Sequence, residues 1–185
     1  MAVRLVVLGR QGAGKGTQCA RLHEHYGAPH ISTGDMLRAA AVEGTEFGLK
    51  AKDFMDRGEL LPDEIMIGVV KERLAQDDVA EHGYLLDGFP RTVGQATALD
   101  DILGGDMGLA LNIDVPLDEV KQRIRGRGRD DDSDEAVERR LALYEQETAP
   151  LIQWFTERDM MLNVDGIGTE DEIAARLIDV IDAHT

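Results

Sequence analysis

The stretch that decides the fold is Gly9-Arg10-Gln11-Gly12-Ala13-Gly14-Lys15-Gly16-Thr17, which follows the apolar run Val3–Leu8 and precedes a helical pattern. Glycines let the backbone approach an anion closely, and the N–H groups at the start of a helix point toward it. Lys15 adds a positive charge for the β- and γ-phosphates of a nucleotide. A strand, a GxxxxGK loop and a helix in this order therefore predict a phosphate-binding loop rather than a merely structural turn.

Short apolar runs alternate with helical patterns along the rest of the chain, which predicts an α/β fold: a doubly wound, five-stranded parallel sheet with helices on both faces. The segment between the second and third strands is too long for a single crossover, so residues 33–75 are expected to form several helices beside the sheet. The five predicted strands are Val3–Leu8, Pro29–Ser32, Gly83–Asp87, Leu109–Val115 and Met161–Asp165.

The composition excludes several classes of protein. The 185 residues carry 20 Lys and Arg against 36 Asp and Glu, a formal net charge of −16. Such a charge repels nucleic acids and anionic membranes, so neither is expected as a partner. The single cysteine, Cys19, rules out a disulfide framework and an all-cysteine zinc site, and any metal is expected to use oxygen ligands. No apolar run approaches the roughly 18 residues of a membrane span, and a cytoplasmic location is expected.

Two further motifs fall where a ligand of the phosphate loop would lie. Ile31-Ser32-Thr33-Gly34-Asp35-Met36-Leu37-Arg38 predicts a helix that Thr33 could cap, with Arg38 about one turn inside it. Leu85-Leu86-Asp87-Gly88-Phe89-Pro90-Arg91-Thr92 ends the third strand with an acid at its carboxyl edge, where parallel sheets bind ligands. Asp87 is therefore a candidate for holding magnesium through water, although an aspartate at a strand end is also a common cap.

Arginines are concentrated near a glycine-rich, highly charged loop. Arg123 and Arg127 are four residues apart on a predicted helix and share one face. The loop Gly126–Glu135 has no apolar residue, which predicts an exposed connection between two helices. The next helix is expected to continue to Pro150, to kink there and to end near Arg158. So many fork-shaped cations suit a polyphosphate ligand, the alternative being a solvated, salt-bridged helix end.

The spacing Gly-x-x-Gly-x-Gly-Lys-Gly-Thr, with glycine directly after the lysine, resembles the P-loop of the adenylate kinases and related nucleoside monophosphate kinases. The Asp87–Arg91 string and the arginines fit that family in order along essentially the whole chain. Many members have proline where Gln11 stands, so this loop is expected to be less pre-ordered. The short loop without cysteines resembles the short-lid form, for which no zinc is expected.

The resemblance implies the roles of the site residues. On the ATP side it implies Gly12, Ala13, Gly14, Lys15, Gly16, Thr17, Arg123, Arg127 and Gly168. On the AMP side it implies Thr33, Arg38, Glu59, Leu60, Leu61, Gly88, Arg91, Gln95, Arg129 and Arg140, with Gln95 facing the adenine edge. Lys15, Arg91, Arg123, Arg129 and Arg140 are the implied catalytic group, and Asp87 the implied magnesium anchor. A solvent-facing Gln95 is the alternative for that position.

The expected function is thus reversible, magnesium-dependent phosphoryl transfer, ATP + AMP = 2 ADP, by a monomer. The expected organisation is one domain with a core of residues 1–32, 62–127 and 138–185, an AMP-binding subdomain of residues 33–61 and a lid of residues 128–137. Two alternatives stay open: a pyrimidine nucleoside monophosphate kinase, which would differ at the Gln95 pocket, and a binding module that holds ATP without turnover.

Overall fold

The computed structural model describes residues 2–185, apart from the side chain of Arg127. Its sheet contains β1 (Val3–Leu8), β2 (His30–Ser32), β3 (Gly83–Asp87), β4 (Leu109–Asp114) and β5 (Met161–Asp165). The helices are α1 (Lys15–Tyr26), α2 (Thr33–Val42), α3 (Glu46–Asp56), α4 (Asp63–Leu74), α5 (Asp77–His82), α6 (Val93–Ile102), α7 (Leu117–Arg127), α8 (Asp134–Leu143), α9 (Pro150–Thr156) and α10 (Glu170–Asp182).

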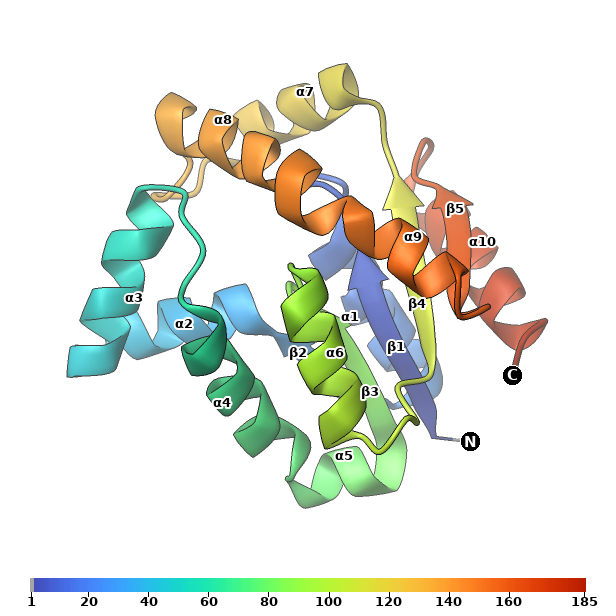
Figure 1. Cartoon of the computed structure of the whole chain (residues 1–185). Helices are drawn as coiled ribbons and strands as arrows, with labels where there is room; N and C mark the ends of the chain where they lie inside the picture. The colour runs from blue at the N-terminus through green and yellow to red at the C-terminus, as the bar shows by residue number, and fades with distance from the viewer. Residues whose placement is uncertain (1) are drawn as a thin grey trace.

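The five strands are all parallel and lie in the order β2-β3-β1-β4-β5, which confirms the predicted fold class. β1 lies in the centre, with Val3 paired to Gly83 on one side and Leu5 paired to Leu109 on the other (Figure 1). The chain goes from β1 to β2 in one direction and from β3 to β4 in the other, so the loop after β1 lies at the switch point of the sheet, where open α/β folds bind ligands.

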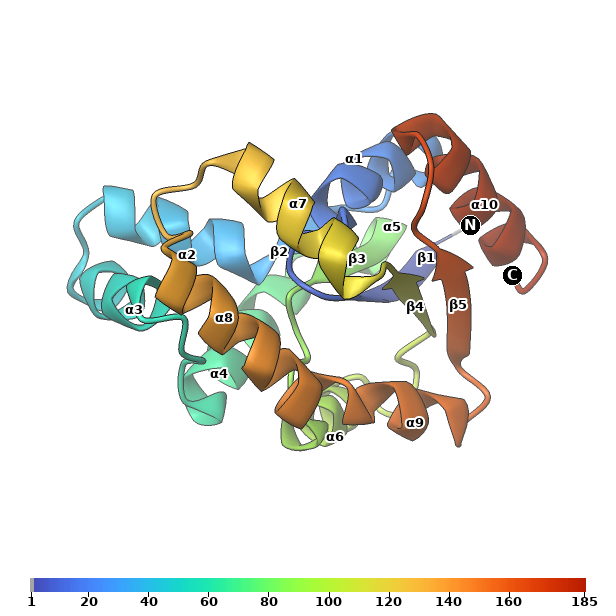
Figure 2. The same cartoon turned by 90° about the horizontal axis from the view of Figure 1, so that it is seen from above.

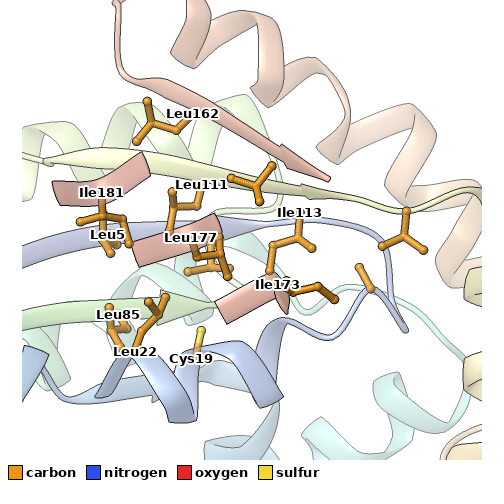
Figure 3. Packing of buried hydrophobic residues seen from close by; sticks show 14 of the residues in the cluster. Leu5, Cys19, Leu22, Leu85, Leu111, Ile113, Leu162, Ile173, Leu177 and Ile181 are labelled. Carbon is orange, nitrogen blue, oxygen red and sulfur yellow. The ribbon is translucent and has the colours of Figure 1, made fainter. Parts of the chain in front are cut away.

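Helices cover both faces of the sheet, as Figure 2 shows: α1 and α10 lie on one side, and α6 and α9 on the other. Each face is closed by its own apolar cluster because alternate residues of a strand point to opposite sides. Leu5 and Val7 of β1 belong to one cluster, whereas Val6 and Leu8 belong to the other. Figure 3 shows the first cluster, in which Leu22 of α1 and the α10 residues Ile173, Leu177 and Ile181 pack on the sheet.

The strand predictions need only small corrections. The second strand begins at His30 rather than Pro29, and the fourth ends at Asp114 rather than Val115. Residues 33–75 do form several helices, namely α2, α3 and α4. Short helix α5 follows them and was not foreseen, because its six residues show too little periodicity to predict a helix.

The predicted connection between two helices is present, since α7 ends at Arg127 and α8 begins at Asp134. α8 continues through a π-helical turn, Tyr144–Thr148, into α9, and Pro150 is the first residue of α9. The Ala149 N–H bonds the Tyr144 carbonyl at 2.7 Å, and this wider turn precedes a residue that has no N–H to donate. Within residues 2–185, no helix is both long and apolar enough to cross a bilayer.

Because the sheet separates two cores, one large side chain can be removed from each. Leu22 and Leu99 are fully buried on opposite faces, whereas Leu49 of α3 is 52 % exposed. We expect Leu22→Ala and Leu99→Ala each to lower the free energy of unfolding by about 2–5 kcal/mol, because each leaves a cavity.

Leu49→Ala is the matched control, with an expected change within about 0.5 kcal/mol. Urea unfolding monitored by circular dichroism measures all three variants. A Leu99→Ala variant as stable as Leu49→Ala would contradict the assignment of α6 to the second core.

Candidate active site

The loop after β1 forms one wall of a cavity of about 650 Å³. The loop leaves the strand at Leu8, and Gly14 takes a left-handed conformation (φ 95°) at the N-cap of α1. Lys15 folds back over the loop, with its Nζ donating to the carbonyls of Gly9 (2.8 Å) and Arg10 (3.1 Å). The loop, the lysine and the first N–H groups of α1 thus lie at one wall of the same space.

The cavity brings together segments that are far apart in the sequence. Every residue assigned to the site above lines it, except Arg127, whose side chain lies outside the described residues. The lining residues from these assignments are Gly12, Ala13, Gly14, Lys15, Gly16, Thr17, Thr33, Arg38, Glu59, Leu60, Leu61, Asp87, Gly88, Arg91, Gln95, Arg123, Arg129, Arg140 and Gly168. A single space beside the carboxyl ends of β1 and β3 is therefore lined by glycine backbone, by cations and by several carboxylates.

Asp87, the last residue of β3, is 9 % exposed, and its Oδ2 lies 3.5 Å from Nε2 of His30. Burial raises the pKa of this carboxyl, but His30 and the charges of Lys15 and Arg91 more than offset it, and the net pKa is lowered. Asp87 is therefore ionised at neutral pH, as a magnesium anchor must be.

His30 and Cys19 form a cluster with Asp87 that the sequence alone did not indicate. Their ligand atoms all lie within 4.8 Å of one another. Burial raises the pKa of the Cys19 thiol well above its usual value, so the sulfur is held as a neutral thiol rather than the thiolate that binds metals. The hard oxygen ligands, Asp87 and the hydroxyl of Thr17, therefore fit magnesium better than this mixed set fits a softer ion.

The loop after β3 holds a second cation on the other side of the cavity. Arg91 is half-buried, and its Nε donates to the Gly88 carbonyl at 2.8 Å. Burial lowers the pKa of the Arg91 guanidinium, while the charge of Asp87 opposes this change. Among the described residues, no carboxylate forms a salt bridge with Arg91, and a partly buried cation of this kind favours an anionic ligand.

Gln95 is not solvent-facing: it is only 2 % exposed and its amide is held by two partners. Its Oε1 accepts from the Arg91 backbone N–H at 2.7 Å, and its Nε2 donates to Asp63 Oδ1 at 2.7 Å. The solvent-facing alternative for Gln95 is therefore wrong. The structure also shows a partner, Asp63, that the sequence analysis did not identify.

At the start of α2, the capping residue is Ser32 and not Thr33. Ser32 Oγ accepts from the Asp35 N–H at 3.3 Å, whereas Thr33 Oγ1 points to the Asp87 carbonyl at 3.4 Å. Thr33 thus connects α2 to the end of β3. Arg38, one turn further, donates to Asp35 at 2.5 Å and presents its guanidinium to the cavity.

The charged connection after α7 and helix α8 contact the α2–α3 region, and residues of these segments line the cavity. Arg140 of α8 donates to the Met55 carbonyl (2.6 Å) and to Asp131 (2.7 Å). Asp131 also lies 3.8 Å from Arg38. The neighbouring Arg139, which does not line the cavity, donates to Glu59 at 2.8 Å.

Gln11 contributes a contact that proline could not make at this position. Its Nε2 donates to Asp132 Oδ1 at 2.8 Å, so the phosphate loop is joined directly to the segment after α7. Asp132 also lies 3.3 Å from Arg140. This hydrogen bond restrains the phosphate loop and so opposes the loss of order that is expected from the missing proline.

Arg123 of α7 joins the phosphate loop to the turn after β5. Its guanidinium donates to the carbonyls of Gly166 (3.0 Å) and Ala13 (3.4 Å) and pairs with Glu119. Gly168 follows in the same turn, and Thr169 is the N-cap of α10, where it forms a capping box with Glu172. Arg129 is exposed and lines the cavity. Burial raises the pKa of Asp35, but Arg38 and Ser32, with a smaller contribution from the charge of Arg129, lower it overall.

Comparison with known proteins agrees with this geometry. A family model described as adenylate kinase matches residues 7–160. The adenylate kinase of Thermodesulfovibrio yellowstonii is 44 % identical over 205 aligned positions, which cover 92 % of this chain and 95 % of that protein. Those of Xanthomonas campestris pv. campestris strain 8004 and Stenotrophomonas maltophilia are each 47 % identical, covering 95 % and 97 % of this chain and 97 % and 99 % of their own.

Gly88 offers a test of how tightly this site is built. Its φ is +85°, and a Cβ added there would lie 2.7 Å from Thr33 Oγ1 and 3.3 Å from Arg91 Nη2. We expect Gly88→Ala to lower the free energy of unfolding by about 2 kcal/mol or more, from backbone strain and the displaced neighbours.

Gly94, in α6, is the matched control, because its nearest contact would be an ordinary 3.5 Å to Asp63. Gly94→Ala should stay within about 1 kcal/mol of the parent or exceed it in stability, since alanine favours the helix. Urea unfolding compares the two, and equal stabilities would show that the Gly88 turn is not constrained as described.

Proposed function

The chain belongs to the adenylate kinase family, and from this premise we propose how its cavity positions the two substrates. It is a nucleoside monophosphate kinase that transfers a phosphoryl group between ATP and AMP, with two ADP as product. The observation that carries the proposed arrangement is the pair of cation sets, one at the phosphate loop and one around Arg91, that face a single cavity.

On the donor side, we assign ATP to the phosphate loop. The N–H groups of Gly12, Gly14 and Gly16, with Lys15 and Thr17, would surround the β- and γ-phosphates, because a helix N-terminus and a lysine both stabilise such charge. In this assignment Lys15 exchanges its two loop carbonyls for phosphate oxygens. Ala13, Arg123, Arg127 and Gly168 complete the proposed ATP site, with Gly168 beside the adenine.

On the acceptor side, we assign AMP to the opposite half of the cavity. Arg38 and Arg91 would bind its phosphate, and Gln95 would face its base from α6. The backbone of the segment before α4 would line the sugar and base. Thr33, Glu59, Leu60, Leu61 and Gly88 complete the proposed AMP site.

The proposed chemical step needs no general base, because the nucleophile is an AMP phosphate oxygen that is already anionic. That oxygen attacks the γ-phosphorus in line, a new P–O bond forms, and the bond to the β-phosphate oxygen breaks to release ADP. Lys15, Arg91, Arg123, Arg129 and Arg140 would stabilise the charge that redistributes over the transferring oxygens. The protein thus works by positioning and electrostatics.

Magnesium, on which the family depends in general, fits the oxygen ligands described above. Asp87, ionised at neutral pH, would hold it through water, with the Thr17 hydroxyl nearby. When bound, the ion would neutralise phosphate charge. No zinc is proposed.

We also propose that residues 33–61 form an AMP-binding subdomain and residues 128–137 a lid, which move on the core of residues 1–32, 62–127 and 138–185. The ion pair between Asp131 and Arg38 supports this, because it joins the two segments without using the sheet. Closure of both would exclude water and protect ATP from hydrolysis.

The net charge of −16 supports a cytoplasmic monomer that avoids nucleic acid and membranes.

The function is tested by ADP formation from ATP and magnesium with AMP present, absent, or replaced by CMP or UMP. We expect turnover to require AMP and to fall at least tenfold with either pyrimidine nucleotide. A preference for CMP or UMP would identify a pyrimidine nucleoside monophosphate kinase. ATP binding without turnover on any acceptor would identify a binding module instead.

A further inference from the structure

Asp63, the first residue of α4, bonds to Gln95 of α6 and to Thr92, the N-cap residue of that helix. Its Oδ1 accepts from Gln95 Nε2 at 2.7 Å, and its Oδ2 accepts from Thr92 Oγ1 at 3.0 Å. Pro62 takes the N-cap position of α4. Both carboxylate oxygens are therefore directed at the neighbouring helix that carries Gln95.

These bonds fix which end of the Gln95 amide is the nitrogen. The Arg91 backbone N–H can only donate, so the atom beside it must be the amide oxygen, at 2.7 Å. The Asp63 carboxylate can only accept, so the atom beside it must be the amide nitrogen. A flipped amide would place two donors together and two acceptors together, and with Gln95 only 2 % exposed, water cannot relieve that cost.

The fixed amide has one N–H and one oxygen lone pair left over, because Asp63 and Arg91 each use one of its hydrogen-bonding positions. Adenine offers a donor, its 6-amino group, beside an acceptor, N1. Hypoxanthine has the same shape but offers an acceptor, O6, beside a donor, N1–H. An amide held in this orientation can pair its free N–H and oxygen with N1 and the 6-amino group of adenine. To pair with O6 and N1–H of hypoxanthine, the amide must exchange the positions of its nitrogen and oxygen.

We propose that Asp63 is a specificity-determining positioning residue: it locks the sense of the Gln95 amide and so makes the acceptor site select 6-aminopurine over 6-oxopurine nucleotides. This rests on the proposed function, in which Gln95 faces the acceptor base. The same amide oxygen holds the Arg91 backbone, so the base contact and the phosphate-binding arginine are set by one network.

The test compares AMP with IMP as acceptor at saturating ATP, using the ratio of their kcat/KM values. We expect Asp63→Ala and Asp63→Ser to lower the AMP-to-IMP ratio at least tenfold, because only the Arg91 N–H then opposes turning the amide over. The change should come mainly from KM for the monophosphate, with KM for ATP within about twofold of the parent. Serine is well tolerated in the first turn of a helix, so one of the two variants is expected to fold.

Two variants separate positioning from a general structural effect. Asp63→Asn keeps an acceptor oxygen for Gln95 Nε2, and its ratio should return to within threefold of the parent. Glu64→Ala removes the neighbouring exposed acid from the same turn of α4, and the ratio should not change.

An unchanged AMP-to-IMP ratio in folded Asp63→Ala or Asp63→Ser would overturn the proposal, as would an equal loss in Asp63→Asn or Glu64→Ala. The parent protein reports separately on the proposed function. If it turned over no AMP at all, the acceptor assignment itself would fail, whereas AMP turnover with a ratio insensitive to Asp63 rejects only the role of Asp63.

Discussion

The structure depends on one electrostatic constraint: several backbone N–H groups and cations must converge on the carboxyl edge of a parallel sheet. The loop after β1 supplies the first of these, since Gly14 turns the chain into α1 and leaves the helix N-terminus facing the cavity. Parallel pairing of β1 with β3 brings Asp87 and Arg91 to the same edge. The arginines of α2, α7 and α8 line the same space. Because the chain as a whole is acidic and repels anions, these arginines supply the local positive charge that an anionic ligand needs.

The acidic side chains of the segment after α7 form ion pairs with these cations. Asp131 bonds Arg140 and lies near Arg38, so one carboxylate lies between two of the arginines proposed to bind phosphate. Both Asp131 and Arg140 are largely shielded from solvent, with side chains 11 % and 15 % exposed. Phosphates that enter the site would compete with this carboxylate for the same arginines, so that one anion would take the place of another.

Local sequence was sufficient for the strands, the phosphate loop and the charged connection, because each of these is encoded within about ten residues by periodicity or glycine spacing. It was not sufficient for contacts that depend on tertiary geometry. His30 reaches Asp87 only because β2 pairs with β3, and Asp63 reaches Gln95 only because α4 packs beside α6. The choice of Ser32 over Thr33 as the cap likewise depends on the neighbouring Asp87 carbonyl, to which Thr33 turns.

In the proposed arrangement, two phosphate subsites, each with its own cation, face one cavity. Isothermal titration of ATP and of AMP, each alone, into Lys15→Met and Arg91→Ala tests it most directly, with folding checked by circular dichroism. We expect Lys15→Met to weaken ATP binding by about tenfold or more and to leave AMP binding within about threefold, and Arg91→Ala to do the reverse. If both variants weakened the same nucleotide, or neither weakened any, the two-subsite account would be contradicted.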